Sequence, residues 1–218
     1  MTRSSPSAQV SQLRIAVLLL AAGEGSRLGI YPKALLHRDG KTLLECFSRA
    51  IQGFDPVECI VVTGFHAQLI ESEIVKLNHS VTHTMKIVRN VSPEEGQPSS
   101  VRLGLESFRA NFDVLLLALS DQSEVGAKEI QELLDEYAKR EDGQEIILPM
   151  VGGRRGNPVL FSYKAVSDVL AKPGMVCRVY MNEHPDEVRV MQTSNQAFVM
   201  DVDTPEDIQR HKLNLFPF

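Results

Sequence analysis

Short apolar runs alternate with amphipathic stretches along most of the chain. The apolar runs predict β-strands, and they fall near 14–21, 58–64, 85–90, 113–121 and 145–150. The stretches between them carry apolar residues at helical spacing and predict helices at 42–52, 67–77, 99–109 and 127–139. Several strands are apolar almost throughout, which is typical of strands covered on both faces. The pattern therefore predicts a three-layer α/β/α sandwich around a mostly parallel, mixed sheet.

The last third of the chain is less regular. Its pattern predicts helices near 163–171 and 175–184 and a strand near 187–191, but assigns no element to "GGRRGNPVLF". Because no repeat or linker interrupts the alternation, we expect one domain over 13–218. The polar segment 1–12 is expected to be a disordered tail.

Composition narrows the class of protein. Apolar residues make up 43% and charged residues 23%, as in ordinary globular proteins. The net charge of −5 argues against broad binding to nucleic acid or to an anionic membrane. The three cysteines lie far apart and predict neither a disulfide framework nor a zinc site, so we expect a cytoplasmic protein. The run "RIAVLLLAAG" imitates a signal peptide, but the loop after it favours a buried strand.

That loop is the strongest chemical signal in the chain. In "LLLAAGEGSRLGIYPKALL", an apolar strand passes into a segment with glycines at 23, 25 and 29. A strand, a glycine-rich loop and a following helix present several backbone N–H groups to an anion, typically a phosphate. Arg27 and Lys33 add two positive charges. We therefore expect a phosphate-binding loop.

Two better-known phosphate motifs do not fit this segment. The glycines follow GxGxxxG rather than the GxGxxG of dinucleotide-binding folds, and the next strand does not end in an acidic residue. The string "GKT" at 40–42 lacks both the preceding strand and the first glycine of a P-loop.

Residue by residue, "LLAAGEGSRLGIYPKALL" resembles the nucleotidyltransferase signature LAAGxGxRxGxPKxLL. The chain is similar to the MobA-like NTP transferase family, and above all to its molybdenum cofactor cytidylyltransferases. The resemblance implies a Rossmann-like nucleotidyltransferase fold of the glycosyltransferase-A type. One departure is visible: Ile30 and Tyr31 separate Gly29 from Pro32, where the cofactor branch usually has one residue.

The resemblance also implies which residues bind the nucleotide. In the family, the glycine-rich loop and a GxxxSxxxGL segment, here within "EEGQPSSVRLGLE", contact the triphosphate, ribose and base. The corresponding positions are Ala21, Ala22, Gly23, Gly25, Ser26, Arg27, Lys33, Gly96, Gln97 and Ser100.

Two isolated aspartates are candidate Mg²⁺ ligands. Asp121 ends the strand "VLLLALSD", and ligands bind open α/β sheets at the carboxyl ends of strands. "DVDTPED" is similar to the family's DxDTPED segment, which implies that Asp201 is the second ligand. Asp203 and Thr204 also suit a helix start, so Asp203 is given a supporting role. We expect Arg27, Lys33 and Asp121 to be the catalytic residues.

The segment "GGRRGNPVLF" is similar to GxxGHPVLF of the cytidylyltransferase branch, which approaches the acceptor. Arg154 and Arg155 are therefore candidate ligands of an acceptor phosphate. Asn157 is a third acceptor candidate and replaces the usual histidine.

The resemblance predicts a Mg²⁺-dependent enzyme that transfers CMP from CTP to the phosphate of molybdopterin and releases pyrophosphate. Such an enzyme would hand its product to a molybdoenzyme or its chaperone. GTP remains open as the donor. One alternative is a sugar-1-phosphate nucleotidyltransferase, which the two-residue spacer favours. A second alternative is a non-catalytic nucleotide- or cofactor-binding accessory protein.

Overall fold

The computed structural model describes residues 13–29 and 31–215, so the predicted tail at 1–12 lies outside the described part. Apolar strands build one large sheet with the order β10-β7-β9-β6-β1-β4-β5, and the short β8 pairs with β7. The strands are β1 (Ile15–Ala21), β4 (Glu58–Thr63), β5 (Met85–Arg89), β6 (Val114–Leu119), β7 (Ile146–Val151), β8 (Arg154–Arg155), β9 (Val159–Ser162) and β10 (Val188–Gln192). A separate hairpin joins β2 (His37–Arg38) and β3 (Lys41–Thr42).

The sheet is mixed, as the alternating pattern predicted. β1 runs parallel to β4 and β6, and β7 runs parallel to β10. β9 is antiparallel to both β6 and β7 and joins the two parallel halves. β9 was not predicted as a strand, because its short apolar stretch follows a glycine- and arginine-rich segment without alternation.

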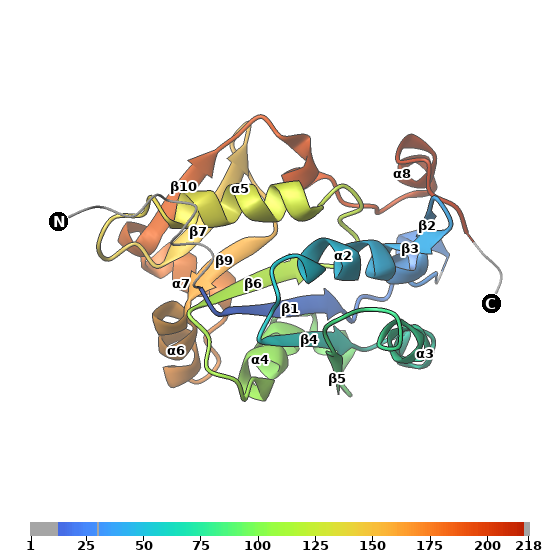
Figure 1. Ribbon diagram of the computed structural model, residues 1–218, viewed down its shortest axis with the longest axis horizontal. Coiled ribbons are helices and arrows are strands. Elements are labelled where there is room, and N and C mark those ends of the chain that lie inside the picture. The colour runs from blue at the N-terminus through green and yellow to red at the C-terminus, as the bar shows by residue number, and fades with distance from the viewer. Residues whose placement is uncertain (1–12, 30, 216–218) are drawn as a thin grey trace.

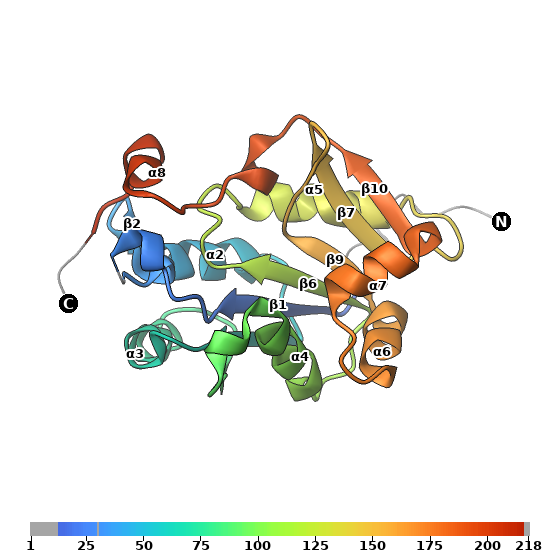
Figure 2. The same cartoon turned by 180° about the vertical axis from the view of Figure 1, so that it is seen from behind.

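Helices cover both faces of this sheet. They are α2 (Leu43–Gln52), α3 (Ala67–Leu77), α4 (Gln97–Ser107), α5 (Ala127–Tyr137), α6 (Tyr163–Ala171), α7 (Cys177–Glu183) and α8 (Pro205–Arg210). Figure 1 shows α2 and α5 in front of the sheet, and Figure 2 shows α4, α6 and α7 on the opposite side. The three-layer α/β/α prediction is confirmed.

The alternation of side chains along β1 divides the core between these faces. Val17 and Leu19 pack in the cluster that includes α2, α3 and α5, whereas Leu18 and Leu20 pack in the cluster that includes α4, α6 and α7. Every residue of β1 is buried, which follows from its central position between β4 and β6. None of the helices in the described ranges combines the length and apolar character needed to cross a bilayer.

Half of a capping box is present at the start of α2. The Thr42 hydroxyl accepts a hydrogen bond from the Glu45 N–H at 3.0 Å, which satisfies one free donor of the first turn. The Glu45 carboxylate does not return the bond, because it pairs with Arg49 one turn later. Thr42 therefore stops the β2–β3 hairpin and starts the helix without the reciprocal contact.

A buried carboxylate links the start of β4 to two neighbouring segments. The Glu58 side chain is 1% exposed and accepts hydrogen bonds from Lys86 at 2.7 Å and from the Arg109 and Ala110 N–H groups at 2.8 Å each. Burial by itself would raise the pKa of Glu58, but these donors outweigh it and hold the pKa below its usual value.

We expect Glu58→Gln to reduce the free energy of unfolding at pH 7 by about 1–3 kcal/mol, because it removes a charge-assisted bond in a buried site. A lowered native pKa gives stability that is present above the unfolded pKa and lost as pH falls through the native pKa. The free energy of unfolding, measured with denaturant at several pH values across that acidic range, should therefore decrease less steeply with falling pH in Glu58→Gln than in the wild type. The exposed Glu106→Gln is the matched control, and equal slopes in all three proteins would contradict this account.

Candidate functional site

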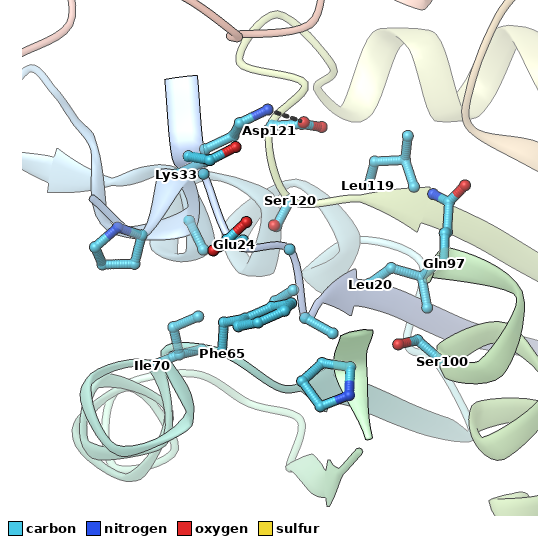
Figure 3. A pocket seen from close by; sticks show the side chains of 18 of the residues that line it. Leu20, Glu24, Lys33, Phe65, Ile70, Gln97, Ser100, Leu119, Ser120 and Asp121 are labelled. Atoms are coloured by element: carbon cyan, nitrogen blue, oxygen red, sulfur yellow. Dashed lines mark hydrogen bonds and ion pairs between the residues drawn. The ribbon is translucent and has the colours of Figure 1, made fainter. Parts of the chain in front are cut away.

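A cleft of about 510 Å³ opens at the carboxyl ends of β1 and β6. Backbone from the glycine-rich loop forms one wall, and the first turn of α4 forms the other. All the residues predicted to bind the nucleotide line this cleft: Ala21, Ala22, Gly23, Gly25, Ser26, Arg27, Lys33, Gly96, Gln97 and Ser100. Figure 3 shows Lys33 and Asp121 at one end, Gln97 and Ser100 at the other, and Phe65 between them on the lower wall. The cleft thus has one charged end and one neutral end.

The glycine-rich loop depends on the conformation of Gly25. This residue has φ of +67°, and a Cβ atom there would lie 2.5 Å from the Tyr31 carbonyl oxygen. The helix predicted at 42–52 is present as α2, but it does not follow the loop directly in the chain. Two 3-10 turns, Ser26–Leu28 and Lys33–Leu35, follow instead, and α2 begins only at Leu43. Gly29 in the left-handed region and Pro32 prevent a continuous helix there.

Lys33 connects the loop to the acidic end of the cleft. Its amine donates hydrogen bonds to Asp121 Oδ2 at 2.9 Å and to Asp203 Oδ1 at 2.5 Å. The Lys33 side chain is 19% exposed, and burial alone would lower the pKa of its amine. The two carboxylates outweigh that effect and hold the pKa above its usual value, so the amine stays protonated. Arg27 bonds the other oxygen of Asp203 at 3.2 Å.

Asp121 has one oxygen left for a ligand. Its Oδ1 atom is buried and has no hydrogen-bond partner among the described residues, although buried polar atoms normally have one. The backbone brings the second predicted metal ligand close, since the Val202 N–H donates to the Asp121 carbonyl at 3.1 Å. An oxygen donor of this kind suits Mg²⁺.

Asp201 is electrostatically coupled to this group. Although the residue is exposed overall, partial burial raises the pKa of Asp201, and the negative charges of Asp121 and Asp203 raise it further. Lys33 and Arg154 oppose the increase. The negative charge that surrounds Asp201 favours a bound cation. Asp203, which sequence reasoning placed in a supporting role, lines the cleft, whereas Asp201 does not.

Across 13–29 and 31–215, no three acidic, histidine or cysteine side chains converge as a complete metal site. Lys33 occupies one oxygen of Asp121 and one of Asp203. The Oδ1 of Asp121, unpartnered among the described residues, is an oxygen donor that suits Mg²⁺, an ion that commonly takes its remaining ligands from phosphate oxygens and water.

A second cavity of about 750 Å³ lies beside the cleft, and Gln97 lines both. The three predicted acceptor residues, Arg154, Arg155 and Asn157, all line this second cavity. The Asn157 N–H donates to the Phe198 carbonyl at 2.8 Å, and the Arg154 guanidinium donates to the Val199 carbonyl at 3.3 Å. The acceptor segment is thereby attached to the chain that leads into Asp201.

A cluster behind the cleft holds the site segments together. Glu124, three positions after Asp121, forms an ion pair with Arg38 of β2 and contacts His211 Nδ1 at 3.4 Å. These partners follow Lys33 and Asp203 in the chain, respectively. Sequence reasoning missed Glu124 because nothing local marks a carboxylate whose partners lie far away in the chain.

The MobA-like NTP transferase domain matches residues 17–187 of this chain. The chain is 28% identical over 200 residues to nicotine blue oxidoreductase of Paenarthrobacter nicotinovorans, covering 88% of this chain and 94% of that protein. Two solved structures share the fold. One is 4-diphosphocytidyl-2C-methyl-D-erythritol synthase from Anaerococcus prevotii, with a TM-score of 0.70, 14% identity and coverage of 94% of this chain and 96% of that one. The other is Rv0371c from Mycobacterium tuberculosis in complex with manganese, with a TM-score of 0.67, 20% identity and coverage of 91% and 97%.

The matched range runs from within β1 to the residue before β10, and therefore includes the glycine-rich loop, Asp121 and the strands β6, β7 and β9 beside the second cavity. The chain belongs to the MobA-like NTP transferase family.

Proposed function

We propose that the protein transfers a nucleotidyl group from a nucleoside triphosphate to a phosphate-bearing acceptor and releases pyrophosphate. The observation that carries this proposal is the charged end of the cleft. There the Lys33 amine bonds to Asp121 and Asp203, and the Oδ1 atom of Asp121 has no partner among the described residues. Backbone of the glycine-rich loop forms the adjacent wall. A polyanion and a cation are the ligands that such a combination favours.

The residues of the cleft would divide the work by position. The loop N–H groups, Lys33 and Arg27 would bind the triphosphate, with the two cations exchanging their bonds to Asp203 for phosphate oxygens. Gln97 and Ser100, at the other end of the cleft, would bind ribose and base. Mg²⁺ held by Asp121 and Asp201 would neutralise charge on the phosphate oxygens.

Transfer then requires that the acceptor phosphate and the triphosphate, which are both anionic, be held in line for reaction. The acceptor phosphate in the second cavity would attack the α-phosphorus, forming a new P–O bond while the bond to pyrophosphate breaks. Lys33 and Arg27 would stabilise the departing pyrophosphate. Arg154, Arg155 and Asn157 would hold the acceptor.

Within this reaction class, the sequence resemblance favours CTP as the donor and molybdopterin as the acceptor, with handover of the product to a molybdoenzyme or its chaperone. The three cysteines are all unpaired, which supports a reducing compartment such as the cytoplasm. A sugar 1-phosphate is the alternative acceptor. An accessory protein without catalysis would bind the triphosphate but release no pyrophosphate.

Oxidoreduction is a second candidate function, because the relative named as an oxidoreductase spans nearly all of this chain. In that case the glycine-rich loop, Arg27 and Lys33 would bind the diphosphate of a dinucleotide. The apolar second cavity would then take a conjugated substrate.

Each of the four triphosphates, labelled at the α-phosphate, should be incubated with the full chain, Mg²⁺ or Mn²⁺, and either molybdopterin or a sugar 1-phosphate. We expect label transfer and equimolar pyrophosphate with one donor. Consumption of a reduced nicotinamide without pyrophosphate release would instead support oxidoreduction, and binding without either reaction would support an accessory role.

We expect Asp121→Asn to lower kcat/KM for nucleotidyl transfer by at least about 10²-fold, the usual cost of removing one group that stabilises developing charge. Circular dichroism should show an unchanged fold. Asp142→Asn, at an exposed position away from both cavities, should retain full activity. Turnover close to wild type in Asp121→Asn would refute the metal assignment.

The loop itself is tested by Gly25→Ala. The added methyl group meets the Tyr31 carbonyl in a left-handed backbone conformation, so the amides should lose their arrangement. We expect the Kd for the preferred triphosphate to rise at least about tenfold, the equivalent of one lost charge-assisted hydrogen bond. Thermal shift against triphosphate concentration measures this. Gly53→Ala, where nothing lies within 4 Å of the added atom, is the control. An unchanged shift in Gly25→Ala would exclude the loop as the phosphate site.

A further inference from the structure

The second cavity combines apolar walls with positive charge. Side chains from β6, β7, β9 and α7 form its floor, among them Leu117, Leu148, Phe161 and Met181, all of which are buried. Three arginines line the same space: Arg154, Arg155 and Arg178. No acidic side chain lines it. An apolar floor with cations around it suits a flat ligand that carries negative charge.

Two of these arginines differ from every other arginine in the described ranges. Each of the others donates a hydrogen bond to a carboxylate or to a backbone carbonyl. In contrast, the side chains of Arg155 and Arg178 have no hydrogen-bond or ion-pair partner within 13–29 and 31–215. Arg178 was not identified from the sequence.

This lack of partners is unusual for the protein as a whole. The chain has 28 acidic and 23 basic residues, so carboxylates are not scarce. Arg155 lies on β8 and Arg178 on α7, yet both line one cavity. Both residues are exposed to solvent, and no acidic side chain lines the cavity to neutralise their charges. Both guanidinium groups are therefore available for an anionic group of a ligand.

Arg154 is committed elsewhere. It donates to the Val199 carbonyl, two positions before Asp201, and its charge acts on Asp201 itself. Among the three arginines of the second cavity, it is therefore the one coupled to the acidic group, and the reacting phosphate of an acceptor would lie beside it. The remaining pair, Arg155 and Arg178, is not needed for that phosphate.

We propose that Arg155 and Arg178 bind a second anionic group of the acceptor, distinct from the phosphate that receives the nucleotidyl group. The acceptor would then be a flat, largely apolar molecule with negative charge at both ends. This inference rests on the proposed transferase function for the identity of the first anion, but the second site can be tested by binding alone.

The test measures binding of simple probes to the full chain by calorimetry, in the presence of Mg²⁺ and the preferred triphosphate. The probes are 2-naphthol, 2-naphthyl phosphate, and a 2-naphthyl phosphate that also carries a sulfonate on the far ring. The wild type should bind the doubly charged probe at least about tenfold more tightly than the monophosphate, as expected for one charge-assisted contact.

Arg178→Ala and Arg155→Ala should each reduce this preference at least about threefold and together abolish it. The affinity of Arg178→Ala for the monophosphate should stay within about twofold of wild type, the usual range for a change that removes no contact. Arg178→Lys, which keeps the charge, should retain part of the preference. Arg49→Ala, at an exposed ion pair on α2, should behave as wild type. Thermal melts establish that each variant is folded.

If Arg178→Ala lost affinity for both charged probes to the same extent, the proposal would be overturned, because Arg178 would then only support the structure of the cavity. A wild type that does not distinguish the two charged probes, or that binds neither, would overturn it as well. Failure of the transferase proposal has a different signature. It would leave the probe preference intact while no labelled triphosphate is consumed.

Discussion

The site depends on the contact of one buried ammonium group with two carboxylates. Lys33 comes from the loop after β1, Asp121 from the end of β6, and Asp203 from the segment before α8. A charge with so little exposure must be paired, and removal of a partner leaves the remaining charge uncompensated. The requirement to satisfy Lys33 therefore brings three distant segments to one end of the sheet. In the proposed function, Asp203 is the counter-charge that an incoming phosphate would replace.

Further contacts join the same three segments behind the cleft. Arg38, Glu124 and His211 connect the β2–β3 hairpin, the loop after Asp121 and the end of α8. The backbone adds a bond from Val202 to Asp121 and a bridge between His37 and Asn214. Since side chains are positioned best when their supports are fixed, these contacts keep the acidic groups in place before any ligand binds.

Much of this arrangement was predictable from local pattern. The apolar strands predicted the three layers of the sandwich, and the glycine spacing predicted a phosphate-binding loop. Both predictions were possible because each signal lies in residues that are neighbours in the sequence. β9 escaped notice because a short antiparallel strand between parallel ones has no periodic signature of its own. The helix predicted at 42–52 is present, but Gly29 and Pro32 favour two short 3-10 turns between the loop and that helix. Local pattern did not indicate the roles inferred for Glu124, Asp203 and Arg178. Those roles follow from contacts, or from a lack of contacts, with residues far away in the sequence. The single-domain boundary and the roles of the site residues stay predictions.

Lys33 and Asp203 are 170 positions apart, and this separation has a consequence during synthesis on the ribosome. β1 emerges first but lies in the middle of the finished sheet, so it must wait for β6 to cover its second edge. A nascent chain consequently exposes an apolar strand with an unpaired edge until β6 has been made, and exposed apolar strands of this kind are prone to aggregation. Of the two acidic partners of Lys33, Asp121 follows at mid-chain, and Asp203 is made only near the end of synthesis. A product truncated before Asp203 can therefore carry the complete glycine-rich segment and still leave Lys33 with one carboxylate instead of two.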